Sequence, residues 1–289
     1  MKSKIYLILF ALVAFSCSSD SSSDDGNNNN NGGNNNTGNA LLVSEINETN
    51  ADATYTYRYF YDGNKLTSIV NEYSFQNENP EVEYIYNFIY TNNKISRIDE
   101  YYGDTSQGIE GRYTFEYDNQ GRVSSYNFCY LTNSGTCEYT DTNNYTYSSN
   151  GTVTNSYVYE VGTDYEEAGT LTLQLDNNGN IIGGNDSYLD VDENGNPISV
   201  TVTGSFEYDN QNSPFKNIVG MDAIILNAIS GSILSFNAYN NCTFYSFEYS
   251  DEDEAEQYNL AYDYNEDGYP RQVILTDGSY SSTIDVNYY

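Results

Sequence analysis

The stretch FEYDNQGRV, residues 115–123, joins an aromatic strand end to a polar turn and an apolar restart. Related stretches are YFYDGNKL, FIYTNNKI, YTYSSNGTV, LQLDNNGNI, LDVDENGNP, FEYDNQNSP and YDYNEDGYP. Their aligned residues are Tyr61, Tyr90, Tyr117, Tyr147, Leu175, Val191, Tyr208 and Tyr264, with separations of 29, 27, 30, 28, 16, 17 and 56. A period near 28 fits two antiparallel strands with two connections. The repeat therefore predicts an all-β, antiparallel up-and-down meander of hairpins.

The turn residues support this prediction. Gly63-Asn64 and Asn92-Asn93 fit two-residue hairpin loops. In the other six units, six positions instead of five separate the aligned residue from the next apolar residue. We therefore expect a type I turn that closes through a residue with positive φ. Glycine, or the asparagine that often replaces it, stands at that position: Gly121, Gly151, Gly179, Asn212, Gly195 and Gly268.

Alternation assigns the aromatic residues to strand faces. One row contains Tyr55, Tyr57, Tyr59 and Tyr61, and another contains Val82, Tyr84, Tyr86, Phe88 and Tyr90. Such rows stabilise a sheet by stacking across strands, and they equally suit a platform for sugar rings. An exposed aromatic patch would favour binding, whereas fully covered rows would favour a structural role.

One segment interrupts the meander. The stretch NSPFKNIVGMDAIILNAISGS, residues 212–232, starts with Ser213-Pro214, is apolar in its middle and has Gly231 near its end. This pattern predicts a short helical or apolar insertion near 213–231 that covers a sheet face. The inserted length also accounts for the doubled spacing before Tyr264.

The amino terminus is typical of an export signal. Lys2 and Lys4 precede an apolar run of 11 residues, 5–15, which is too short to span a membrane. Ser16-Cys17 follows and resembles the lipobox of bacterial lipoproteins, which implies acylation of Cys17. SSSDD, residues 21–25, resembles the acidic export tag of Bacteroidota lipoproteins, which implies display outside the cell. The alternatives are an ordinary signal peptide with an incidental cysteine, and a solvated linker.

These features divide the chain into three parts. Residues 1–16 are a lipoprotein signal peptide, residues 17–39 are a disordered Ser/Asp/Asn/Gly tether, and residues 40–289 are one repeat-built β domain. A flexible tether of this length spans roughly 25 Å. We therefore expect an outer-membrane protein that faces the cell exterior and contacts the membrane through the lipid on Cys17.

Composition excludes several functions. Without Lys2 and Lys4 the chain has 8 basic and 42 acidic residues, a formal charge of −34, which repels nucleic acid. It has no His, the commonest general base and transition-metal ligand. Residues 190–201 and 263–274 resemble calcium loops, but Thr201 and Ile274 replace the bidentate Glu. We therefore predict hairpin turns at both places, no metal, no cofactor and no enzyme.

Three cysteines remain after Cys17. Cys129 and Cys137 flank YLTNSGT between two strand-like arms, so we predict a disulfide across that hairpin, which export permits. Cys242 is either a small buried apolar residue or a reactive thiol.

The Y-D-x-x-G turns resemble the YD repeats of RHS-type proteins. Together with the lipobox and SPFKNI, they resemble Bacteroidota surface lipoproteins of unknown function built from such repeats. RHS shells enclose a toxin, but this chain shows no cargo domain, and the resemblance implies no catalytic residues. We expect a non-catalytic binding or scaffolding domain, with a glycan or a protein as its partner. The alternatives are a purely structural envelope protein and a carboxylate-dependent glycoside hydrolase.

Overall fold

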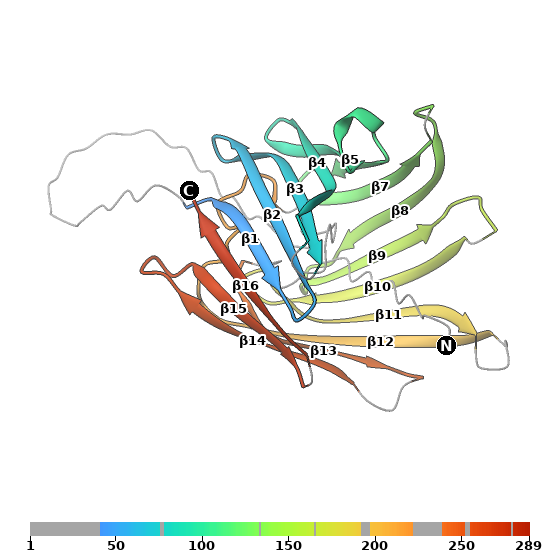
Figure 1. Ribbon diagram of the computed structural model, residues 1–289. Helices are drawn as coiled ribbons and strands as arrows, with labels where there is room; N and C mark the ends of the chain where they lie inside the picture. Colours follow the sequence, from blue (N-terminus) through green and yellow to red (C-terminus); the bar gives the residue numbers. More distant parts are fainter. Residues whose placement is uncertain are drawn as a thin grey trace, which may run out of the picture.

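The protein forms a closed β-barrel (Figure 1). The structure, a computed structural model, describes residues 41–289 except 76–77, 133, 165, 192–196, 222–238, 252–254 and 279. Every strand pairs antiparallel with its neighbours in the chain, and β1 pairs with β16, for example through Ile46 and Val286. The predicted all-β antiparallel meander is confirmed, and its closure into a barrel goes beyond that prediction.

The described residues form sixteen strands and one short 3₁₀ helix, η1 (Thr105–Gln107). The strands are β1 (Val43–Thr49), β2 (Ala53–Asp62), β3 (Lys65–Phe75), β4 (Glu81–Thr91), β5 (Lys94–Tyr102), β6 (Gly111–Tyr117), β7 (Val123–Leu131), β8 (Cys137–Tyr147), β9 (Thr152–Tyr159), β10 (Glu167–Leu175), β11 (Ile181–Val191), β12 (Pro197–Tyr208), β13 (Cys242–Tyr249), β14 (Glu256–Tyr264), β15 (Pro270–Asp277) and β16 (Tyr280–Tyr288). Within these residues, no helix has the length and apolar character to cross a membrane.

The two ends of the barrel differ. At one end, which we call the tight-turn end, short turns join β2 to β3, β4 to β5, β6 to β7, β8 to β9, β10 to β11 and β14 to β15. The opposite, long-loop end includes the connections after β5 and β7. The unit at Val191 ends β11 and therefore lies at the long-loop end. Treating it as equivalent to the others was wrong, since its spacings of 16 and 17 each correspond to a single strand.

The predicted left-handed glycines are largely confirmed. Gly121, Gly151, Gly179 and Gly268 have φ of 79°, 81°, 89° and 76°. Gly195 lies outside the described residues. The prediction for Asn212 is wrong, because it does not have positive φ. The chain there does not turn back into a neighbouring strand but enters the inserted segment, and β13 starts only at Cys242.

Side-chain contacts explain why the repeat contains Tyr-Asp. Asp118 accepts hydrogen bonds at Oδ1 from the backbone of Gln120 and Arg122, at 2.8 and 3.0 Å, and so holds its turn. The preceding Tyr117 donates its hydroxyl to the carbonyl of Ile95, 2.7 Å away in β5. Its ring also lies under the Lys94 ammonium, 5.2 Å from the ring centre. The motif therefore ties successive hairpins together.

The inner face of the barrel is a packed apolar core. Every strand contributes at least one side chain to a single buried cluster, and the predicted Tyr rows point into it, with Tyr59 and Tyr57 buried. The inserted segment joins this core through Phe215 and Ile218. Residues 214–220 form turns and a bend rather than a helix, Met221 is helical, and the rest of the predicted insertion, residues 222–231, lies outside the described part.

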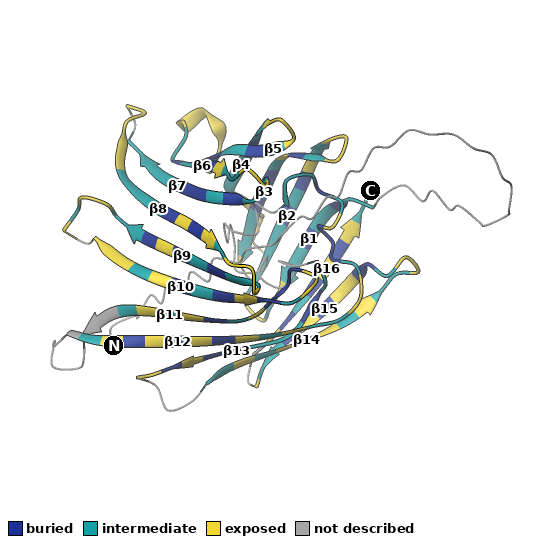
Figure 2. Cartoon of the chain, turned by 180° about the vertical axis from the view of Figure 1, so that it is seen from behind, coloured by how far each residue is buried: buried dark blue, intermediate teal, exposed yellow. Residues whose placement is uncertain are grey.

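The outer face is polar, and burial alternates along the strands (Figure 2). On β2 the outward Arg58 lies between Glu45 of β1 and Glu72 of β3 and forms an ion pair with each. On β15 the outward Ile274 is 42 % exposed, whereas the inward Ile284 of neighbouring β16 is 1 % exposed. Most outward side chains are thus charged, amidated or hydroxylated, and apolar ones such as Ile274 are scattered among them.

Candidate functional site

A cavity of about 460 Å³ lies at the long-loop rim, between the β5–β6 and β7–β8 connections. We call it the rim cavity. Its lining residues combine aromatic, acidic, basic, amide and hydroxyl groups: Tyr102, Gln107, Gly108, Ile109, Glu110, Arg112, Tyr130, Leu131, Thr132, Ser134 and Gly135. Ligand cavities of this size typically combine apolar surface with a few placed polar groups.

Two tyrosine rings supply the apolar surface. Tyr102, at the end of β5, is 54 % exposed, and its ring meets that of Tyr84 edge-on at 5.5 Å. Tyr130, near the end of β7, stacks almost parallel on Tyr139 at 5.3 Å. These contacts hold the rings while leaving Tyr102 open to solvent. Tyr102 can therefore offer a ring face to a ligand.

Glu110 supplies the carboxylate. Its backbone N–H donates to the carbonyl of Glu100 at 2.8 Å, and its own carbonyl accepts from the backbone N–H of Leu131 at 2.7 Å. The Tyr130 hydroxyl donates to Oε1 of Glu110 at 3.2 Å. Within the described residues, Oε2 is buried and has no hydrogen-bond partner. A buried acceptor without a donor is costly, so Glu110 can accept a hydrogen bond from a ligand.

Arg112 brings a guanidinium to the same cavity. Its Nε donates to Oδ1 of Asp99 at 2.7 Å, and Arg97 pairs with Oδ2 of that carboxylate at 3.1 Å. Asp99 is 4 % exposed. Two cations thus share one buried carboxylate, which fixes the orientation of Arg112.

Glu100 lies beside the cavity but does not line it. Its Oε2 accepts from the hydroxyl of Tyr113 at 3.1 Å. Burial, helped by the charge of Glu110, raises the pKa of Glu100 to about 7, and the Tyr113 hydrogen bond opposes that rise. Position 111 requires glycine, because an added Cβ would come within 2.6 Å of the Phe128 ring.

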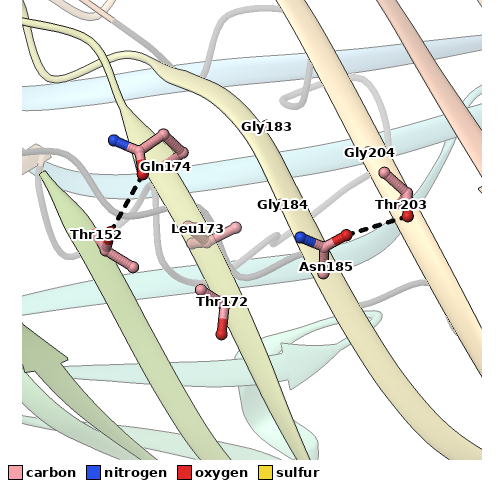
Figure 3. A pocket seen from close by; sticks show the side chains of 9 residues that line it. All are labelled: Thr152, Thr172, Leu173, Gln174, Gly183, Gly184, Asn185, Thr203 and Gly204. Carbon is pink, nitrogen blue, oxygen red and sulfur yellow. Dashed lines mark hydrogen bonds between the residues drawn. The ribbon is translucent and has the colours of Figure 1, made fainter.

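A second hollow, of about 300 Å³, opens on the outer face of β9–β12 (Figure 3). Gly183 and Gly204 leave the wall thin, and the surrounding side chains are uncharged. Thr152 donates to Gln174 at 3.1 Å, and Thr203 donates to Oδ1 of Asn185 at 3.0 Å. We call the outward polar side chains around this hollow the hydroxyl face: Thr142, Asn144, Thr146, Thr152, Thr154, Ser156, Thr170, Thr172, Gln174, Asn185, Ser187, Thr201, Thr203 and Ser205.

The residues singled out in the sequence fall in different places. Cys17 lies outside the described residues. Cys129 and Cys137 form a disulfide that closes the β7–β8 loop at the rim cavity. Cys242 is a buried free cysteine, and burial raises the pKa of its thiol to about 12, which suits the structural interpretation. In the second calcium-like loop, Asn265 accepts from the backbone of Tyr269 and forms the β14–β15 turn.

Sequence reasoning missed Glu110, Tyr102 and Arg112. The only local signal was the Gly-containing connection 103–110, which includes Glu110, follows Tyr102 and is longer than the tight turns. In the part of the chain that the structure describes, no group of three or more Cys, Asp or Glu side chains is arranged to hold a metal ion.

The comparisons with known proteins show a similar fold but no family. No protein-family model and no curated protein matches the chain. Among solved structures, a porin-like protein from Bacteroides vulgatus is similar, with a TM-score of 0.55, 12 % identity, and coverage of 86 % of this chain and 99 % of the other. A porin-like protein from Bacteroides uniformis has a TM-score of 0.49 and 15 % identity, covering 86 % and 98 %. At this identity the likeness to the Bacteroides vulgatus protein concerns the barrel fold alone.

Proposed function

We propose that this chain is a lipid-anchored outer-membrane protein, displayed on the cell exterior, whose barrel stands in water and binds a glycan without catalysis. The rim cavity carries the proposal, because it joins an exposed ring, Tyr102, to polar groups on Glu110 and Arg112. A sugar presents an apolar ring face and a rim of hydroxyls, so these groups complement it.

The barrel wall supports a position in water. A transmembrane barrel shows lipid an outward apolar band flanked by aromatic residues, and its interior is polar. Here most aromatic and aliphatic side chains point inward, and the outer face carries ion pairs within its strands, between Arg58 and Glu45 and between Arg112 and Asp99. The lipid on Cys17, rather than the wall, would then hold the protein at the membrane.

Contacts at the tight-turn end support a barrel that is closed at that end rather than an open channel. Residues 213–220 lie at that end, where the Val219 N–H donates to the carbonyl of Asn64 at 3.0 Å. Asn217 donates to the carbonyl of Leu41 at 2.8 Å, and Phe215 packs on Tyr59 with ring centres 5.7 Å apart. A ligand would therefore reach the long-loop rim more readily than the interior.

A binding experiment tests the rim cavity. The full chain, purified in a non-ionic detergent, is applied to a glycan array, and the best glycan is titrated calorimetrically. We expect Tyr102→Ala to weaken binding about tenfold, since one stacked ring and its ordering are lost. Tyr101→Ala is the matched control, because Tyr101 neighbours Tyr102 but faces outward. Equal affinities of the two variants would contradict the rim site.

Anchoring and display have their own tests. Mass spectrometry of the mature protein should find an acylated Cys17 as its first residue, and an unmodified amino terminus would refute the anchor. Protease added to intact cells should degrade the domain. Replacing Asp24 and Asp25 with Ala should protect it, and unchanged cleavage would show that the acidic stretch does not direct export.

A structural envelope role is the second candidate. The observation that favours it is the burial of the inward rows, in which Tyr57, Tyr59 and Tyr86 are covered by the core. These tyrosines act in packing, which leaves Tyr102 and Tyr130 for a ligand. Absence of binding to every glycan on the array would favour this second role.

A further inference from the structure

We propose that the hydroxyl face is a second binding surface, separate from the rim cavity, and that its ligand is a neutral polysaccharide. The first reason is its lack of charge. Residues 142–146, 152–158, 168–174, 182–187 and 199–205 contain one charged residue, Asp186. Asp186 belongs to the inner face, where it accepts from the Tyr157 hydroxyl at 3.1 Å. In a chain with 42 acidic residues, a whole sector of the wall is thus uncharged.

The second reason is the regular placement of the polar groups. The pairing register places Thr146, Thr154, Thr172, Asn185 and Thr203 directly opposite one another in one row across β8–β12. With strands about 4.8 Å apart, this row spans roughly 19 Å. It therefore offers a line of donors and acceptors long enough for several units of a polymer.

The third reason is the hollow beside this row. The neighbouring row passes from Thr152 to Gln174 and then to Gly183 and Ser205. Gly183 has no side chain, and the hollow of about 300 Å³ lies over this gap. The Thr203 hydroxyl holds Oδ1 of Asn185, and Figure 3 shows the Asn185 amide nitrogen directed away from Thr203. A sugar ring can therefore approach the backbone while meeting fixed polar groups.

These observations select the class of ligand. Protein interfaces use Tyr, Trp and Arg as anchors, and Ser and Thr rarely contribute strongly to them. A net charge of −34 on the mature chain repels anionic polymers and draws cationic ones to the acidic parts of the surface. A neutral polyhydroxylated chain needs no charged partner, and on this face it desolvates no charged side chain. Hydroxyl and amide groups match its hydroxyls.

Affinity electrophoresis tests the proposal. The full chain in non-ionic detergent is run in native gels containing amylopectin, xyloglucan, galactomannan or polygalacturonate. We expect at least one of the three neutral polymers to retard it and polygalacturonate not to. Thr172→Glu should weaken retardation about tenfold or more, because it places a charge in the middle of the row. Thr172→Val, which keeps the shape, should weaken it about fivefold, as for one lost hydrogen bond.

Two control variants separate this surface from the rest of the wall and from the rim cavity. Thr114→Glu adds the same charge to an exposed outward position of β6 and should leave retardation unchanged. Tyr102→Ala should also leave it unchanged, so failure of the rim cavity is distinguishable from failure of this surface. Retardation by no neutral polymer, or equal effects of Thr172→Glu and Thr114→Glu, would overturn the proposal. So would a dimer in sedimentation experiments that Thr172→Glu dissociates, which would make the face a contact between copies.

Discussion

The inner and outer faces of the barrel wall differ more than any other two regions of this molecule. Most side chains that point inward belong to one aromatic and aliphatic core, whereas most that point outward are hydroxylated, amidated or charged, with scattered apolar residues such as Phe60 and Ile274 among them. A barrel in lipid needs the opposite distribution. The likeness to a porin-like protein concerns how the strands are connected. The side chains on each face determine the solvent that the wall can occupy.

Replacing an isoleucine by aspartate on each face gives the largest expected difference between the inner and outer faces. Ile284→Asp would bury a charge in the core and should lower the free energy of unfolding by about 4 kcal/mol or more. Ile274→Asp, on the outer face of the adjacent strand, should change it by less than about 0.5 kcal/mol. Urea unfolding followed by circular dichroism measures both. A large loss at Ile274 would mean that the outer face contacts an apolar medium.

A carboxyl on the inner face makes stability depend on pH. The pKa of Glu100 is raised in the folded protein from near 4.5 to about 7, so the folded state binds this proton more tightly. The associated stability is complete below about pH 4.5 and is lost as the pH rises through 7. We expect a loss of about 3 kcal/mol across this range. Urea unfolding at several pH values should show it.

Glu100→Gln is the control for this pH dependence. The amide keeps the size of the side chain and cannot ionise, so the slope between pH 4.5 and 7 should become smaller by the contribution of one proton. A slope equal to that of the wild type would mean that Glu100 is not the group that responds.

The tight turns set the difference between the inner and outer faces, because their length and conformation determine which residues point inward. Gly121 has φ of 79°, and an added Cβ would meet nothing closer than Lys94 at 3.7 Å, so only the backbone conformation opposes a side chain. Gly121→Ala should cost about 1–2 kcal/mol, and Gly121→Asn should cost less. Gly183→Ala, without positive φ, is the control and should stay within about 0.5 kcal/mol. A neutral Gly121→Ala would contradict the left-handed turn.

The strands and their faces could be predicted because they depend on local patterns. Alternation placed Tyr55, Tyr57, Tyr59 and Tyr61 on one face, and the glycines marked the turns. Closure could not be predicted, since the pairing of β1 with β16 joins residues more than 200 positions apart and leaves no local signal. The apolar stretch after Ser213 predicted the insertion, but the turn wrongly predicted at Asn212 could not be recognised as different, because it begins with the same FEYDNQ as the turn at Gly121.

The rim cavity and the hydroxyl face were harder to predict for a related reason. Glu110 gains its role from Tyr130, a contact between the β5–β6 loop and the end of β7 that the irregular length of the loop hides from any register. The threonines of the hydroxyl face were visible in the sequence as alternating residues. Their common row appears only when the register places Thr154, Thr172 and Thr203 on one line across the sheet.

The smallest expected effect concerns the tyrosine hydroxyls that link hairpins. Tyr147 donates its hydroxyl to the carbonyl of Val123 at 2.6 Å, and its ring lies 4.1 Å from the Arg122 guanidinium. Tyr147→Phe removes the hydroxyl and keeps the ring, so we expect a loss of about 1 kcal/mol in urea unfolding. Tyr101→Phe, on the outer face, should change stability by less than about 0.5 kcal/mol. If both variants lose the same amount, the ring rather than the hydroxyl links the hairpins, and the contact that this repeat tyrosine makes with the neighbouring hairpin rests on stacking.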